Sequence, residues 1–244
     1  NGLPNSRGII LSGPPGTGKT MIAKSMASET EATTILISAE MIQQRNDIKS
    51  AFRLARKLAP TLIIIEDIDT AGTVSRRFAD HPILGEYLQA MDGIEANEGV
   101  VVLATTNHTE NIDPAISDRP GRFDRIIEVP LPDKEQRIKI LANLLTKMPT
   151  ENLTFGLGTE DYFGNETISE IGRDAKHLSG AWIREIVHTA FIFATYDGRN
   201  AISSKDLKAA LKDVKERRGL AYKSTPKLEH NYLEDDSDVN SLFI

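Results

Sequence analysis

The residues best suited to chemistry form a glycine-rich run, "GPPGTGKT", at Gly13–Thr20. The run fits the pattern G-x-x-x-x-G-K-[ST], in which the backbone N–H groups of a loop cradle phosphates. In this pattern the lysine, Lys19, reaches the β- and γ-phosphates, and the hydroxyl of Thr20 is a ligand of Mg²⁺. A chance match in a chain of this length is expected on the order of 1% of the time. The run therefore predicts a nucleoside triphosphate site.

A second group of candidate residues is acidic. In "IIIEDID", residues 63–69, an apolar run ends in Glu66, Asp67 and Asp69. Ligands of open parallel sheets gather at the carboxyl ends of the strands, so we expect these carboxylates to face the phosphate loop and its metal ion. A solvated turn or a helix cap is the alternative interpretation of such a cluster, and the nearby phosphate loop disfavours it.

The elements that must position these residues alternate between short apolar runs and stretches of helical period. Nearly continuous Ile, Val and Leu is typical of strands that are covered on both faces, as in a parallel sheet. The predicted strands are Ile9–Ser12, Thr34–Ser38, Leu62–Ile65, Val100–Ala104 and Ile126–Val129, and the predicted helices between them are Lys19–Glu29, Asp47–Leu58 and Leu84–Met91. This alternation predicts an α/β domain over residues 1–132.

The pattern changes after Pro132. Asp133 can cap a helix that continues to about Lys147, with its apolar residues on one stripe. Three more helices are predicted at Thr167–Lys176, Ala181–Tyr196 and Ser204–Arg217. We therefore expect a small all-helical domain over residues 133–218. The acidic tail, residues 219–244, is either flexible or docks on another surface.

Composition excludes several other classes of protein. The contents of 40% apolar and 26% charged residues are typical of a globular protein, and the net charge of −6 disfavours a general nucleic-acid or membrane surface. The chain has no cysteine, and its five histidines show no helical pairing that suggests a metal site. No apolar run reaches the roughly 18–20 residues of a membrane helix, and no signal peptide opens the chain. We expect a cytoplasmic or organelle-matrix location for what looks like a piece of a longer chain, with any membrane attachment in a region that precedes it.

Over about residues 1–218 the chain resembles the AAA family of ATPases. Four segments carry the resemblance: "GPPGTGKT", "IIIEDID", "ATTN" at 104–107 and "DPAISDRPGRFDR" at 113–125. The resemblance implies an α/β P-loop NTPase core with a helical lid, binding of ATP or ADP with Mg²⁺, and homo-oligomeric rings, usually hexamers. It also implies ATP hydrolysis that remodels or translocates a macromolecular partner, expected to be a protein.

The resemblance also implies roles for single residues. Asn107 resembles the family's sensor residue, which holds the attacking water or touches the γ-phosphate; the alternative is an Asn-initiated turn. Arg119 and Arg122 match two arginines that a neighbouring subunit inserts toward the γ-phosphate; the alternative is local pairing with aspartates. "LSGA" at 178–181 resembles the lid segment that closes over adenine.

The expected catalytic residues are Glu66, Asp67, Asn107, Arg119 and Arg122. The expected metal ligands are Thr20 and Glu66. The expected nucleotide contacts are Pro15, Gly16, Thr17, Gly18, Lys19, Thr20, Met21, Ile140, Gly180 and Ala181.

Two features depart from the family pattern. Most relatives have Asp and then Glu at the strand end, whereas this chain has Glu66 and then Asp67. If roles follow position, Glu66 orders the magnesium shell and Asp67 polarises water; otherwise Glu66 is the base. The loop "AEMIQQRN", residues 39–46, lacks the aromatic and glycine tip of relatives that thread unfolded chains. Both departures, with "TTNH" at 105–108, are similar to the mitochondrial inner-membrane AAA chaperone branch, whereas "RPGRFDR" fits the wider family.

Two other functions are compatible with a phosphate loop. The altered acid pair allows a nucleotide-switched binding module, in which hydrolysis is negligible and ATP drives assembly. A small-molecule kinase is disfavoured, because the sequence has no acceptor-binding motif and because the paired arginines suit a ring ATPase.

Overall fold

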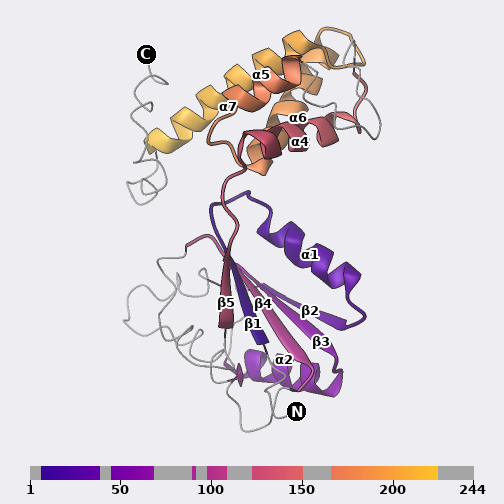
Figure 1. Cartoon of the computed structure of the whole chain (residues 1–244), viewed down its shortest axis with the longest axis vertical. Coiled ribbons are helices and arrows are strands. Elements are labelled where there is room, and N and C mark those ends of the chain that lie inside the picture. Colours follow the sequence, from indigo (N-terminus) through magenta and orange to yellow (C-terminus); the bar gives the residue numbers. More distant parts are fainter. Residues whose placement is uncertain are drawn as a thin grey trace. The chain divides into compact units, whose positions relative to one another are not determined.

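The computed structural model describes residues 7–38, 45–68, 90–91, 98–108, 123–150 and 166–224 (Figure 1). The chain divides into two compact units. The first unit comprises Asn1–Pro132 together with His177–Ala181, and the second comprises Asp133–Lys176 and Trp182–Ile244. The short segment 177–181 therefore packs with the first unit, although the residues on either side of it in the sequence belong to the second.

A five-stranded sheet forms the centre of the first unit. Its strands are β1 (Arg7–Ser12), β2 (Thr33–Ser38), β3 (Thr61–Glu66), β4 (Val100–Thr106) and β5 (Phe123–Glu128). Their order across the sheet is β2-β3-β4-β1-β5, and every neighbouring pair is parallel. This confirms the predicted α/β class with a parallel sheet, although β5 begins at Phe123, three residues before the predicted start at Ile126.

Two helices cover opposite faces of this sheet. Helix α1 (Lys19–Glu29) packs through Ala23 and Met26 against a cluster that includes Leu11, Leu62, Ile64 and Leu103. Helix α2 (Arg45–Lys57) packs through Ile48, Phe52 and Ala55 against the other face, in a cluster with Ile10, Ile63 and Ile65. β3 is therefore buried on both sides, as its continuous apolar run predicted. Of the predicted helix Leu84–Met91, the described residues are Ala90 and Met91, which are helical and buried.

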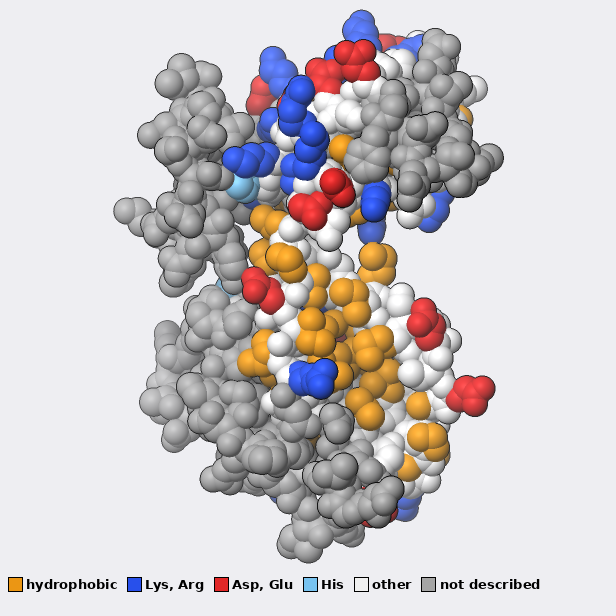
Figure 2. Space-filling model, in the orientation of Figure 1, with side chains coloured by type: hydrophobic (Ala, Val, Ile, Leu, Met, Phe, Trp, Pro, Cys, Tyr) orange, Lys and Arg blue, Asp and Glu red, His pale blue; other side chains and the backbone are white. Residues whose placement is uncertain are grey.

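The face that carries α1 keeps apolar side chains at its surface. Figure 2 shows hydrophobic side chains gathered over the first unit. Leu36 on β2 and Ile127 on β5 pair with residues of the α1-side cluster and are 55% and 44% exposed. The described helices therefore cover this face of the sheet only in part.

The register of the strands brings three carboxyl ends together. Ser12 at the end of β1 lies opposite Thr106 at the end of β4. Ile65, near the end of β3, lies opposite Ala104 of the same β4. The loop that follows β1, the acids that end β3 and the residues that follow β4 therefore meet at one edge of the sheet, where ligands of parallel sheets bind.

The second unit is helical in its described part. It contains α4 (Lys134–Leu145), α5 (Glu166–Asp174), α7 (Ser204–Ser224) and, from Trp182 onward, α6 (Gly180–Tyr196). Asp133 caps α4 in a capping box with Gln136, as the sequence predicted for the cap. Helix α7 runs on to Ser224 rather than ending at Arg217, because the residues around Gly219 include Leu, Ala, Lys and Arg, which favour helix. Residues 225–244 of the predicted tail lie outside the described residues.

Two arginines make polar contacts to buried groups in the second unit. The Arg137 side chain donates from Nε to the Gly172 carbonyl at 2.8 Å, across the contact of α4 with α5. Burial lowers the pKa of this guanidinium from its ordinary value, and the nearby Asp133 opposes that shift. Arg199 binds both carboxylate oxygens of the buried Asp206, each at 2.7 Å, at the start of α7. These two arginines therefore connect backbone and carboxylate groups that would be costly to bury alone.

Candidate active site

The glycine-rich segment after β1 takes a conformation that side chains would prevent. Gly13 has φ +146°, and a Cβ there would lie 2.2 Å from the carbonyl oxygen of Val129. Gly16 has φ +76°, and a Cβ there would lie 2.7 Å from both Ser179 Oγ and Ala181 Cβ. Both positions therefore require glycine, for their backbone angle and for the close approach of a neighbour. The result is a tight backbone loop, exposed at Pro15 and Gly16, that leads directly into α1.

The loop ends at a helix N-terminus whose N–H groups have no side-chain cap. Gly18 is the N-cap residue in the left-handed region, with no side-chain cap hydrogen bond and no acidic residue in the first turn of α1. The N–H groups and the helix dipole make this end attractive to an anion. Thr17 fixes the loop from within, because its hydroxyl donates to the Pro14 carbonyl at 2.9 Å.

Lys19, the first residue of α1, lies under this loop. Its side chain is 5% exposed, and its Nζ donates to the carbonyls of Gly13 at 2.7 Å and Pro14 at 2.9 Å. These two hydrogen bonds hold the ammonium group against the phosphate loop. The neighbouring candidates Pro15, Thr20 and Met21 are exposed, so their side chains are accessible to a ligand.

The acids at the end of β3 have different environments. Glu66 is half-buried, and its Oε1 atom is buried without a hydrogen-bond partner in the described part of the chain. Asp67 is exposed and has φ +51°, which is uncommon for any residue other than glycine. A buried carboxylate oxygen that lacks a partner is costly, so this oxygen is suited to bind a cation or to accept a hydrogen bond from water.

The structure brings Asp67 and Asn107 together, although they are 40 residues apart in the sequence. The Nδ2 atom of Asn107 donates to Oδ1 of Asp67 at 3.2 Å. The backbone N–H of Asp67 donates to Oγ1 of Thr105 at 3.1 Å. Sequence reasoning did not select Thr105; the available signal was a hydroxyl residue that follows the apolar run of β4, two positions before Asn107.

The segment that includes Gly180 and Ala181 lies against the phosphate loop within the first unit. The N–H of Ala181 donates to the carbonyl of Gly16 at 3.1 Å. Ser179 is 2% exposed, and its Oγ has no hydrogen-bond partner among the described residues. Gly180 is half-buried at the start of α6. The backbone of this segment therefore contacts the phosphate loop, whereas the expected contact of Gly180 and Ala181 with a nucleotide stays a prediction.

The described structure does not test the predicted place of three site residues. Arg119 and Arg122 lie outside the described residues. Ile140 is half-buried on α4 in the second unit. Their roles stay predictions.

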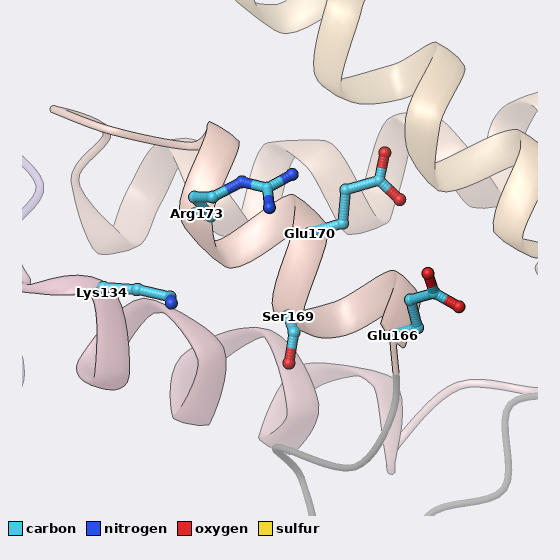
Figure 3. Close-up of a pocket in the computed structure, with 5 residues that line it drawn as sticks. All are labelled: Lys134, Glu166, Ser169, Glu170 and Arg173. Atoms are coloured by element: carbon cyan, nitrogen blue, oxygen red, sulfur yellow. The ribbon is translucent and has the colours of Figure 1, made fainter.

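A cavity of about 190 Å³ lies in the second unit (Figure 3). Lys134 of α4 and four residues of α5 line it: Glu166, Ser169, Glu170 and Arg173. Glu170 is already paired with Lys208 at 2.6 Å, and Arg173 with Asp174 at 3.0 Å. The cavity is smaller than the roughly 300–1,000 Å³ of ordinary ligand pockets, and its two basic and two acidic residues balance. It gives no reason to move the candidate site away from the sheet edge.

The residues at the sheet edge fit a nucleotide phosphate and a magnesium ion. The loop offers backbone N–H groups and a buried lysine to an anion, and Thr20 and Glu66 offer oxygen ligands to a hard cation. Mg²⁺ is usually held by one or two carboxylates together with substrate phosphates and waters, rather than by an all-protein cage. The described residues include no group of three or more His, Cys, Asp or Glu side chains able to hold a metal. Across those same residues we find no helix with the length and apolarity needed to span a membrane.

A parallel sheet with a glycine-rich phosphate loop after β1 and acids after β3 defines the P-loop class of nucleotide-binding proteins. Residues 9–131 match the family described as "ATPase family associated with various cellular activities (AAA)". This match covers half of the sequence, and the chain belongs to that family.

Curated relatives of the chain include several archaeal proteins named proteasome-activating nucleotidase. The protein from Saccharolobus islandicus is 35% identical over 230 residues, which is 89% of this chain and 55% of the relative. The protein from Methanococcus vannielii is 33% identical over 241 residues, which is 92% of this chain and 56% of the relative. The chain thus spans a little over half the length of the curated relatives that it matches.

Proposed function

We propose that this chain is the ATPase module of a ring-forming protein that uses ATP hydrolysis to remodel or translocate a protein partner. One observation carries the proposal: the phosphate loop with its buried Lys19, the partnerless oxygen of Glu66 and the bonded pair Asp67–Asn107 lie at the ends of neighbouring parallel strands. The membership of the chain in an ATPase family supports the same conclusion.

In this proposal the loop and Lys19 bind the β- and γ-phosphates of ATP, and Thr20 and Glu66 are the protein ligands of Mg²⁺. The Lys19 ammonium now holds two loop carbonyls, so phosphate oxygens would replace them as its partners. A magnesium ion held by Thr20 and Glu66 would supply positive charge to neutralise the phosphates. Ala181, whose N–H donates to the loop at Gly16, and the adjacent Gly180 contribute to the nucleotide pocket, and the nucleotide contact of Ile140 stays a prediction.

We assign the orientation of the attacking water to Asp67 and Asn107. The 3.2 Å bond between Oδ1 and Nδ2 holds the Asp67 carboxylate beside an amide that can bind the same water. Glu66 has the partnerless buried oxygen, which suits a ligand of the metal shell better than a base in solvent. These roles follow position at the strand end rather than residue type.

The proposed assembly is a homo-oligomeric ring, with six subunits as the expected number. Arg119 and Arg122 of one subunit would then act on the nucleotide of its neighbour and stabilise the charge that develops on the transferred phosphoryl group. The name of the curated relatives, proteasome-activating nucleotidase, supports a protein partner.

The proposal is tested by the rate of phosphate release at rising protein concentration. A ring enzyme has turnover that rises steeply as subunits assemble. The Lys19→Ala variant is expected to lose nucleotide binding or turnover, because the phosphate charge loses its partner. Normal ATPase activity in that variant would refute the site.

A mixing experiment tests the action of Arg119 across subunits. The Arg119→Ala variant should bind nucleotide normally and hydrolyse it with a lower kcat. Where such arginines have been measured, their contribution to kcat is a factor of about 10³–10⁵. Mixed with Lys19→Ala subunits, it should recover part of the activity, because some interfaces combine an intact site with an intact arginine. No recovery in rings shown to be mixed would contradict this arrangement.

A nucleotide-switched assembly module is the second candidate. The observation that favours it is the order of the acids, since the carboxylate of Asp67 is one methylene shorter than the glutamate of most relatives. Assembly that depends on ATP, with phosphate release flat and near zero at every protein concentration, would select this candidate over the ring ATPase.

A further inference from the structure

The backbone of Asp67 lies in the left-handed region, which residues other than glycine adopt uncommonly. Asp67 and His177 are the residues other than glycine with positive φ in the described part of the chain. Such a conformation persists where the surroundings determine it, and it is found preferentially at functional sites. At Asp67 it follows directly on the last residue of β3, so the chain turns at the point where it leaves the sheet.

Thr105 of β4 supports this conformation through two hydrogen bonds. Its Oγ1 accepts the N–H of Asp67 at 3.1 Å, and its carbonyl oxygen accepts the N–H of Ile68 at 2.9 Å. The side chain of Thr105 is 1% exposed, so water cannot easily replace the hydroxyl. One residue of β4 therefore holds both backbone N–H groups of the turn.

The same strand also directs the carboxylate of Asp67. Asn107, two residues after Thr105, donates to Oδ1 of Asp67 at 3.2 Å. An aspartate has one rotatable bond fewer than a glutamate, so the reach of its carboxylate depends more on where its backbone lies. Restraint of the backbone therefore affects the position of the carboxylate more for aspartate at residue 67 than it would for glutamate.

We propose that Thr105 is a positioning residue for ATP hydrolysis, which acts by fixing the backbone of Asp67 so that its carboxylate meets the attacking water. The inference rests on the proposed function and deepens it. Thr105 would touch neither nucleotide nor metal; it acts through Asp67.

The first test removes the hydroxyl while keeping the shape of the side chain. In Thr105→Val the N–H of Asp67 loses its acceptor, and we expect kcat to fall by about 10- to 100-fold, the scale of a small displacement of a catalytic group. The KM for ATP and the Kd of a fluorescent ATP analogue should change by less than about twofold, because the phosphate loop is untouched. Thr105→Ser keeps the hydroxyl and should retain most of the activity.

Thr61→Val is the matched control. Thr61 is also 1% exposed, and its hydroxyl donates to the Ala55 carbonyl at 2.9 Å, at the end of β3 that is remote from Asp67. This variant loses a buried hydroxyl of the same kind and should keep its kcat. If Thr105→Val does not fold, Thr105→Ala takes its place, because it removes the hydroxyl without adding a methyl group. Its kcat, KM and Kd are then compared with those of Thr105→Ser and Thr61→Val.

A second measurement needs no turnover. In the nucleotide-free chain, amide hydrogen exchange at Asp67 should become about tenfold faster in Thr105→Val and stay unchanged in Thr105→Ser and Thr61→Val. Absence of ATPase activity in the unsubstituted chain would count against the proposed function, and the exchange rates would still decide whether Thr105 holds Asp67.

Three results would overturn the inference. One is a normal kcat in Thr105→Val. Another is a loss in Thr105→Ser as large as in Thr105→Val, because the hydroxyl would then not be the active feature. The third is unchanged exchange at Asp67, since the hydrogen bond would then not restrain its backbone.

Discussion

The contact of Ala181 with the phosphate loop makes a defined prediction for Gly16→Ala. A new Cβ at residue 16 would lie 2.7 Å from Ala181 Cβ and 2.7 Å from Ser179 Oγ, in a backbone with φ +76°. The left-handed conformation alone costs a side chain about 1–2 kcal/mol, and overpacking adds typically 1–3 kcal/mol. The free energy of unfolding should therefore fall by about 2–5 kcal/mol.

Gly99→Ala separates the two causes. Gly99 lies in the same unit with φ +73°, but a Cβ there would approach nothing closer than Ala59 Cβ at 3.2 Å. In this control the free energy of unfolding should fall by about 1–2 kcal/mol, mainly because of the left-handed backbone conformation. Urea unfolding followed by circular dichroism compares the two variants on the same transition, because both changes lie in the first unit.

A double-mutant cycle with Ala181→Gly tests whether Ala181 is a residue that a side chain at position 16 would meet. Deleting the methyl group of Ala181 removes one of the two close contacts, so the cost of Gly16→Ala should be smaller in that background. Affinity for a fluorescent ATP analogue should fall in Gly16→Ala and recover in part in the double variant. A Gly16→Ala variant no less stable than Gly99→Ala, with no coupling in the cycle, would refute the packing of this segment on the loop.

Two further predictions concern the second unit. Gly172→Ala should lower the free energy of unfolding by about 1–2 kcal/mol net, and the urea midpoint with it, because overpacking outweighs the better helix propensity of alanine. A Cβ at residue 172 would lie 2.3 Å from Cγ1 of Ile138. A raised midpoint would contradict this. Hydrogen bonds from Arg199 hold the pKa of the Asp206 carboxyl well below its ordinary value. The ionised carboxylate therefore stabilises the folded chain above about pH 4, the pKa of an unfolded aspartate. That stability is lost as the pH falls toward the pKa of the folded state. Asp206→Asn should therefore unfold at lower urea than the unsubstituted chain at pH 7, with a difference that narrows below about pH 4; a constant difference across pH would refute this role of the carboxylate.

Much of the architecture was predictable because it depends on local pattern. The helix Lys19–Glu29 has the predicted bounds, and β3 is buried on both faces as its apolar run indicated. The least accurate boundaries were the start of β5 and the end of α7. At both places charged residues flank or interrupt the apolar pattern, so pairing with β1 and helix propagation, rather than periodicity, decide where the element begins or ends.

By itself the sequence determined the succession of strands and helices along the chain and the phosphate loop. The glycines, the lysine and the apolar runs that specify these features act through neighbouring residues. Only the tertiary structure decided that Thr105 holds the backbone of Asp67, that Asn107 meets its carboxylate and that Ala181 bonds to Gly16. These contacts join segments that are 38, 40 and 165 residues apart. Such partners are chosen by strand register and by the path of the chain between units, and neither leaves a periodic signal in the sequence.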